Sequence, residues 1–222
     1  MDPMADAADL VAARFPGATW AMLTGSVLGP HRTPGSDLDI VVLRENEPGY
    51  RESLRFRGWP VELFVHTPEQ LARYLAREFV ARKASTHRML AQGIPLLGDP
   101  GDLPAQCARV LAEGPPPLTG AEHDRLRYVL TDLIDDLTHA VDAGERAVIA
   151  AALWAETARA ALAFAGRWIG TGKWLLRDLR ELDPNLAAEW LAARDDPGPL
   201  AERVLGGAGG PLFEGYHAQA PA

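Results

Sequence analysis

The sequence has one cysteine, two lysines and no long uninterrupted apolar run. Cys107 has no second cysteine to pair with, so a disulfide framework within the chain is excluded. Zinc sites built from paired cysteines or from a His-x-x-x-His pattern are absent as well. No apolar run approaches the roughly 18 residues of a membrane-spanning helix, and no signal peptide is recognisable. We therefore expect a cytoplasmic protein without a membrane partner.

Positive charge is also scarce. Acidic residues outnumber basic ones by 30 to 22, and the net charge is −8. Non-specific nucleic-acid binding depends on neutralising phosphates, so this balance argues against a nucleic-acid partner. An acidic surface suits a small cationic molecule better. We expect the scattered histidines to be structural or solvated; they are His31, His66, His87, His123, His139 and His217.

The most informative stretch of the chain contains two aspartates in an i, i+2 pattern. An apolar run ends in Gly25-Ser26, a loop rich in Gly and Pro follows, and Asp37 and Asp39 open a second apolar run. Side chains alternate along a strand, so both aspartates point to one face. Two adjacent carboxylates repel each other unless a cation lies between them, and hard oxygen ligands suit Mg²⁺. Gly25 allows a sharp turn close to a ligand, and Ser26 offers a hydroxyl and an N–H at the start of a helical turn.

A third acid stands in the middle of another strand-like run. Glu62 is flanked by apolar residues in the segment 61–65. A carboxylate in such surroundings is costly to bury without a partner, and a metal held by Asp37 and Asp39 would be one. Glu62 is thus the best candidate for a third ligand; the alternative is an acid on an edge strand that faces solvent.

Together, Gly25-Ser26, the ten-residue spacer and Asp37-Leu38-Asp39 resemble the signature of the nucleotidyltransferase superfamily typified by DNA polymerase β. The resemblance implies that Asp37, Asp39 and Glu62 are catalytic residues and metal ligands. It also implies that Gly25 and Ser26 bind a nucleoside triphosphate. The expected cofactor is Mg²⁺, or Mn²⁺ in its place, and the expected donor is ATP.

The corner before a predicted helix at 173–182 contains Gly170-Thr171-Gly172-Lys173. It is not a P-loop, because Trp174 follows the lysine and the flanking segments are helices. A lysine at a helix N-terminus nevertheless provides positive charge beside free N–H groups. The layout is similar to that of antibiotic nucleotidyltransferases, in which a lysine of a C-terminal helical bundle often reaches the phosphates. This resemblance implies nucleotide binding by Lys173; the alternative is a surface lysine.

The predicted fold class is α+β. Residues 1–114 are expected to form a polymerase β-like catalytic domain with a mixed sheet flanked by helices. The segment Gly114-Pro115-Pro116-Pro117 is expected to separate it from a helical bundle over 118–205, followed by a flexible Gly-rich tail over 206–222. We expect strands at 20–24, 37–43 and 61–65 and an edge strand near 94–99, while 50–56 is either a strand or irregular.

Several helices are expected as well. Thr67 and Gln70 have the spacing of a capping box at the start of one helix, and Asp183-Pro184 caps another. Within the bundle we expect an apolar stripe that includes Val141, followed by a long helix over 145–169.

The predicted activity is Mg²⁺-dependent transfer of a nucleoside monophosphate, most simply AMP, to an acceptor hydroxyl. The preferred acceptor is a small molecule such as an aminoglycoside-like compound. Two alternatives remain: an antitoxin-like enzyme that transfers AMP to a protein, and a non-catalytic nucleotide-binding module. The base preference and the oligomeric state stay open.

Several further side chains have two interpretations each. One helical face is either solvated or a wall of the acceptor pocket; it carries Asp132, Asp135, Asp136 and His139. Glu145 and Glu156 compete with Glu62 for the role of general base. Arg32 is either a phosphate contact or a solvated loop residue.

Overall fold

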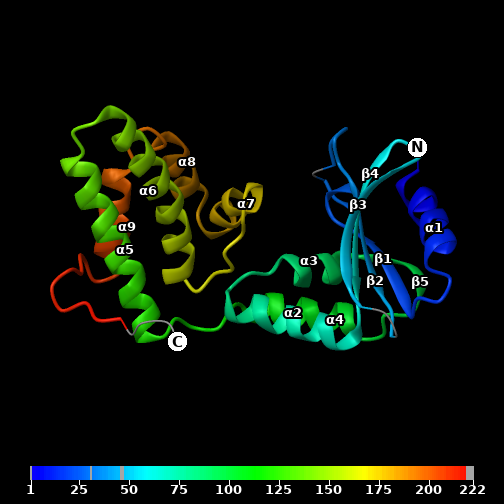
Figure 1. The fold of residues 1–222 in the computed structure, drawn as a ribbon. Helices are drawn as coiled ribbons and strands as arrows, with labels where there is room; N and C mark the ends of the chain where they lie inside the picture. Colours follow the sequence, from blue (N-terminus) through cyan, green and yellow to red (C-terminus); the bar gives the residue numbers. More distant parts are fainter. Residues whose placement is uncertain (1, 31, 46–47, 219–222) are drawn as a thin grey trace. The chain divides into compact units, whose positions relative to one another are not determined.

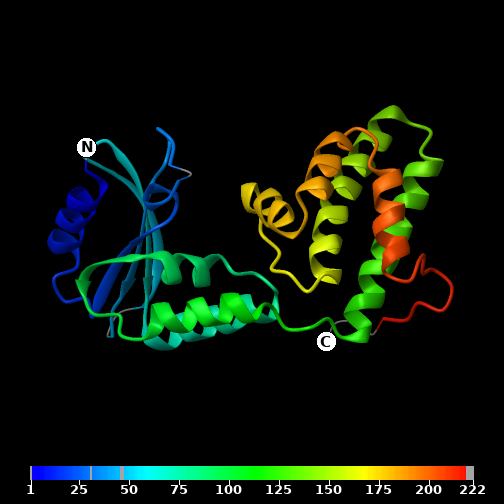
Figure 2. The same cartoon turned by 180° about the vertical axis from the view of Figure 1, so that it is seen from behind.

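The computed structural model describes residues 2–30, 32–45 and 48–218. The chain divides into two compact units, Met1–Glu113 and Gly114–Ala222. The fold is α+β, as the sequence predicts: a mixed sheet and helices form the first unit, and helices form the second within the described residues (Figures 1 and 2). His31, four residues of the predicted tail (219–222) and residues 1, 46 and 47 lie outside the described part.

The first unit contains both strands and helices. Its elements are α1 (Pro3–Arg14), β1 (Trp20–Thr24), the 3₁₀ turn η1 (Ser26–Leu28), β2 (Leu38–Leu43), β3 (Tyr50–Phe56), β4 (Trp59–His66), α2 (Pro68–Val80), α3 (Ser85–Gln92), β5 (Ile94–Gly98) and α4 (Leu103–Glu113). The capping box expected at Thr67 and Gln70 is present at the start of α2.

The five strands form one sheet in the order β3-β4-β2-β1-β5. β2 and β4 are parallel, and the other neighbouring pairs are antiparallel. The segment 50–56, which the sequence leaves open, is an edge strand, and β5 is the other edge. β2 lies in the middle of the sheet, and its residues from Ile40 to Leu43 are buried whichever face they point to.

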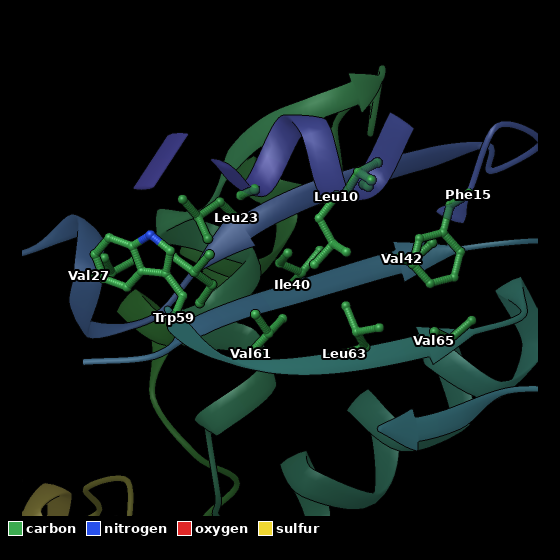
Figure 3. Close-up of a cluster of buried hydrophobic side chains, with 14 residues drawn as sticks. Leu10, Phe15, Leu23, Val27, Ile40, Val42, Trp59, Val61, Leu63 and Val65 are labelled. Carbon is green, nitrogen blue, oxygen red and sulfur yellow. The ribbon is translucent and has the colours of Figure 1, made fainter. Parts of the chain in front are cut away.

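Helices cover both faces of this sheet. On one face, α1 packs over the central strands through Leu10 and, just beyond its end, Phe15 (Figure 3). On the other face, Met22 and Val41 pack beneath α2, α3 and α4 through Leu71, Leu90 and Cys107. The carboxylates described below belong to this second face.

The second unit contains helices joined by loops, and no strand, among its described residues. Its elements are α5 (Gly120–His139), α6 (Ala143–Phe164), α7 (Lys173–Leu182), α8 (Pro184–Ala192) and α9 (Gly198–Gly207). Two sequence predictions are wrong in detail. The helix expected over 145–169 ends at Phe164, and Val141, expected on a buried stripe, is 99% exposed because α5 ends at His139.

Among the described residues, α6 is the one helix whose length and hydropathy would suit a membrane span, a property shared by core helices of soluble proteins. The buried side of α6 contributes Leu153, Ala158 and Leu162 to the bundle core. Cytoplasmic location stays a prediction.

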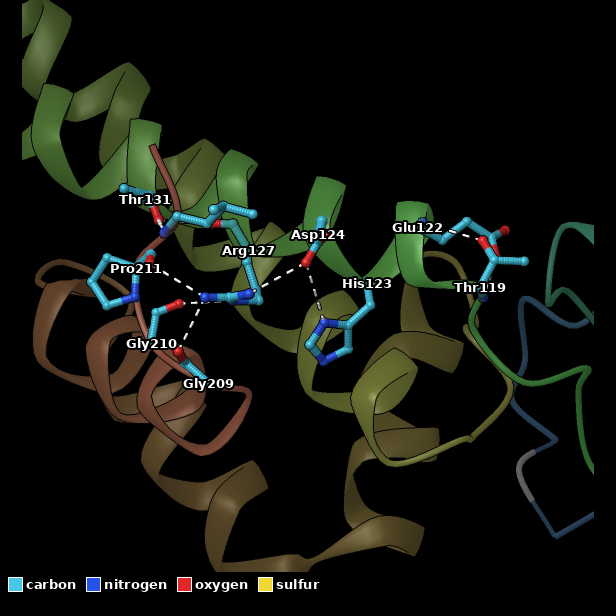
Figure 4. A network of polar contacts seen from close by, with 10 residues as sticks. Thr119, Glu122, His123, Asp124, Arg127, Thr131, Gly209, Gly210 and Pro211 are labelled. Atoms are coloured by element: carbon cyan, nitrogen blue, oxygen red, sulfur yellow. Dashed lines mark hydrogen bonds and ion pairs between the residues drawn. The ribbon is translucent and has the colours of Figure 1, made fainter. Parts of the chain in front are cut away.

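Residues after α9 pack on α5 (Figure 4). The Arg127 guanidinium donates to the carbonyl oxygens of Gly209, Gly210 and Pro211 at 2.9–3.3 Å. The Leu212 N–H donates to Thr131 Oγ1, and Tyr128 stacks on Tyr216 at 4.1 Å between ring centroids. The described part of the predicted flexible tail is therefore a docked segment.

Candidate metal centre

Three carboxylates from two parallel strands meet on one face of the sheet. Asp37 immediately precedes β2, Asp39 lies within it, and Glu62 is the direct neighbour of Asp39 on β4. One carboxylate oxygen of each residue lies within 4.8 Å of the others, and all three side chains are half-buried. The i, i+2 spacing and the parallel register together produce this acidic triad.

Gly25 is packed directly against the triad. Its φ of +84° lies in the left-handed region that favours glycine, and a Cβ built on it would lie 2.0 Å from Asp39 Oδ2. A side chain at residue 25 would therefore occupy the space of the Asp39 carboxylate. The close approach that the sequence predicts for Gly25 is an approach to the protein's own aspartate.

Polar contacts hold the loop between Gly25 and the aspartates at both ends. Ser26 opens η1, and its Oγ lies 3.1 Å from the Oγ of buried Ser36. The Thr33 N–H donates to Ser36 Oγ, and Thr24 Oγ1 donates to the Asp39 carbonyl oxygen at 3.0 Å. Ser26 thus follows Gly25 directly, in a loop that these hydrogen bonds hold in place.

The residues at the triad fit a divalent cation of the Mg²⁺ class. Three carboxylates supply hard oxygen donors on a rigid sheet, which is the ligand type that Mg²⁺ and Mn²⁺ take in proteins. Because the side chains are half-buried, water could complete the coordination shell. Which metal binds stays a proposal.

The sequence analysis missed Arg51, which pairs with Glu62. Arg51 Nη2 lies 2.6 Å from Glu62 Oε2, and its guanidinium lies over the Phe64 ring at 4.9 Å. The signal was the Arg57-Gly58 dipeptide, in which both residues have positive φ. A two-residue hairpin turn there fixes the register of β3 on β4 and brings Arg51 to the face of Glu62.

The other predicted site residues lie elsewhere. Lys173 is the exposed first residue of α7 in the second unit, after Gly172 with φ of +54°. Its phosphate contact stays a prediction, because Lys173 and the triad belong to different units. Arg32, in the first unit, lies over the Trp59 ring at 5.5 Å.

The acidic face of α5 fits the solvated interpretation. Asp132, Asp135, Asp136 and His139 are all exposed, and the His139 ring lies 3.3 Å from the Asp135 carboxylate. Of the rival bases, Glu156 pairs with Arg159 at 3.2 Å and Glu145 is exposed.

Two histidines of the first unit have structural surroundings. His66 ends β4, and burial holds the pKa of its ring below the ordinary value of 6.5. His87 is buried in α3, 3.6 Å from the Glu78 carboxylate.

Comparisons with known proteins found similarity among solved structures only. No protein-family model and no curated protein matches the chain. Among solved structures, it is similar to a nucleotidyltransferase-like protein from Exiguobacterium sibiricum. The identity is 13% and the TM-score 0.48, over 93% of this chain and 74% of that one. The antibiotic-type layout stays a prediction.

Proposed function

We propose that this protein is a metal-dependent nucleotidyltransferase whose centre is the triad of Asp37, Asp39 and Glu62. The observation that carries the proposal is the convergence of these carboxylates within 4.8 Å beside a glycine turn that accommodates one of them. An unmetallated cluster of this kind is electrostatically costly, because like charges at such distances disfavour one another.

In this proposal the triad holds one or two divalent cations, Mg²⁺ or Mn²⁺. A bound cation supplies positive charge at the reacting phosphate and lowers the pKa of the acceptor hydroxyl. The backbone at Gly25 and the hydroxyl of Ser26 position the triphosphate. Lys173 offsets the charge of the leaving group.

The proposed reaction replaces a phosphoanhydride bond of the triphosphate with a phosphate ester bond to the acceptor. The acceptor hydroxyl oxygen forms a bond to the α-phosphorus, the bond from the α-phosphorus to the bridging oxygen breaks, and pyrophosphate leaves with the bond electrons. The hydroxyl proton passes to a nearby base, for which Glu62 is the candidate within the first unit. The products are a nucleotidylated acceptor and pyrophosphate.

The proposed donor is ATP, and the proposed acceptor is a small hydroxylated molecule with cationic groups. The net charge of −8 supports such an acceptor over a polyanion.

Transfer from ATP labelled at the α-phosphate tests this proposal. The purified chain is incubated with Mg²⁺ and either an aminoglycoside panel or a cell lysate, and label on a small molecule or on a protein is measured. We expect label on a small molecule, abolished in Asp39→Asn and retained in Asp195→Asn, which removes a 98% exposed carboxylate in the second unit. Wild-type rates in Asp39→Asn would contradict the metal assignment.

A further inference from the structure

We propose that Arg51 competes with the divalent cation for Glu62 and thereby lowers the metal affinity of the triad. The inference rests on the proposed function, because it takes the triad as a metal site. It concerns a residue of the edge strand β3 that the nucleotidyltransferase signature does not contain.

The guanidinium of Arg51 lies at the carboxylate of Glu62, the third residue of the triad. Residue 53 is the register partner of Glu62, so Arg51 and Glu62 lie on the same face of the sheet, one diagonal step apart. Arg51 Nη2 lies 2.6 Å from Glu62 Oε2. The guanidinium also lies over the Phe64 ring, two residues along β4, which favours this position of the side chain.

A guanidinium and a metal ion interfere with each other at one carboxylate. Where both need the same oxygen, one excludes the other, and where they take different oxygens their positive charges repel. In the metal-free protein, by contrast, Arg51 offsets part of the repulsion among the three carboxylates. Arg51 therefore stabilises the metal-free triad relative to the metal-bound triad.

The exposure of the Arg51–Glu62 ion pair determines how much the loss of Arg51 should change the metal affinity. The Arg51 side chain is 62% exposed and that of Glu62 is 29% exposed, so solvent screens the interaction. Exposed ion pairs contribute little, and removing this one should tighten metal binding by about two- to fivefold. A cation can thus displace Arg51 readily.

Arg55 provides a matched control. It lies on the same strand and the same face, two residues to the other side of Ser53, and it is exposed. Within residues 2–30, 32–45 and 48–218, Arg51 rather than Arg55 forms an ion pair with Glu62. Arg55→Gln removes the same charge from the same face and leaves that pair in place.

The test is Mn²⁺ binding to the intact chain, followed by electron paramagnetic resonance of free Mn²⁺. The variants are Arg51→Gln, Arg51→Lys, Arg55→Gln and Asp39→Asn, each checked for folding by its melting temperature. We expect Arg51→Gln to bind Mn²⁺ about two- to fivefold more tightly, Arg51→Lys to fall between it and the wild type, and Arg55→Gln to change less than Arg51→Gln.

Two results would overturn the inference about Arg51 without affecting the proposed metal site. The first is unchanged or weaker Mn²⁺ binding in Arg51→Gln, as expected of a residue that merely orients Glu62. The second is equally tightened binding in Arg55→Gln, as expected of a general charge effect. Equal Mn²⁺ binding by the wild type and Asp39→Asn would instead remove the metal site, and the inference with it.

Discussion

At the scale of single residues, Gly25 is the position where the site tolerates the least change. Gly25→Ala places a methyl group on the Asp39 carboxylate at a backbone φ of +84°. Backbone strain of this kind costs about 1–3 kcal/mol, and displacement of Asp39 should also weaken metal binding. Urea unfolding and Mn²⁺ titration measure the two effects.

Gly29→Ala is the matched control for this substitution. Gly29 lies at the other end of η1 in an extended conformation, and a Cβ there would meet nothing within 4 Å. We expect its unfolding free energy and metal affinity to stay near those of the wild type. Equal losses in both variants would show that the contact with Asp39 is not responsible.

Cys107 should be unreactive in the folded protein. Burial, together with the nearby Glu78 carboxylate, raises the pKa of its thiol from 9.0 to about 11. The neutral thiol is thus the favoured form in the folded state, so at pH 8 the thiolate fraction is about a hundredfold below that of an unperturbed thiol. Ellman's reagent should react slowly with the native chain and fast in denaturant; similar rates in both would contradict the buried assignment.

At the scale of elements, α3 depends on a carboxylate from α2. The N-cap residue of α3, Ala84, has no capping side chain, and the buried Glu78 accepts from the Thr86 N–H at 2.9 Å and from its hydroxyl at 3.1 Å. Glu78→Ala leaves two buried donors without this acceptor and should destabilise the protein by about 1–3 kcal/mol.

Chemical denaturation measures that loss. Arg73→Ala, on the exposed side of α2, serves as the control and should change stability by less than about 0.5 kcal/mol. If Glu78→Ala leaves the free energy of unfolding unchanged, α3 begins equally well without the Glu78 carboxylate.

The docked tail is held on α5 by Arg127. Arg127→Ala removes the donor to Gly209, Gly210 and Pro211, so residues 208–218 should detach from α5 more often. Limited digestion with chymotrypsin should then cleave after Phe213 and Tyr216 faster than in the wild type. Arg125→Ala, at an exposed position two residues earlier on α5, should leave the cleavage rate unchanged. Equal cleavage rates in both variants would contradict the role of Arg127 in holding the tail.

At the scale of the whole molecule, local patterns in the sequence predict the α+β class and the positions of most strands. The strand period places Asp37 and Asp39 on one face, whereas Glu62 reaches them through the parallel pairing of β2 with β4, which no local pattern predicts. Capping chemistry predicts the starts of α2 and α8 for the same local reason.

Other features depend on contacts between distant segments. Arg51 meets Glu62 only because a hairpin sets the register of β3, and Gly25 meets Asp39 only because β1 and β2 pair. The docking of the tail on Arg127 joins residues more than eighty positions apart. Periodicity and composition do not signal such pairs; the one local cue, the Arg57-Gly58 turn, indicates a hairpin but not which side chains it brings together.

Thermal unfolding measures whether the triad binds a triphosphate together with a metal ion. The intact chain and Asp37→Ala are each melted with the four nucleoside triphosphates, with and without Mg²⁺. A ligand that binds the folded state raises its melting temperature. We predict a Mg²⁺-dependent rise with ATP that is lost in Asp37→Ala; no rise with any triphosphate, or an equal rise in the variant, would contradict the account.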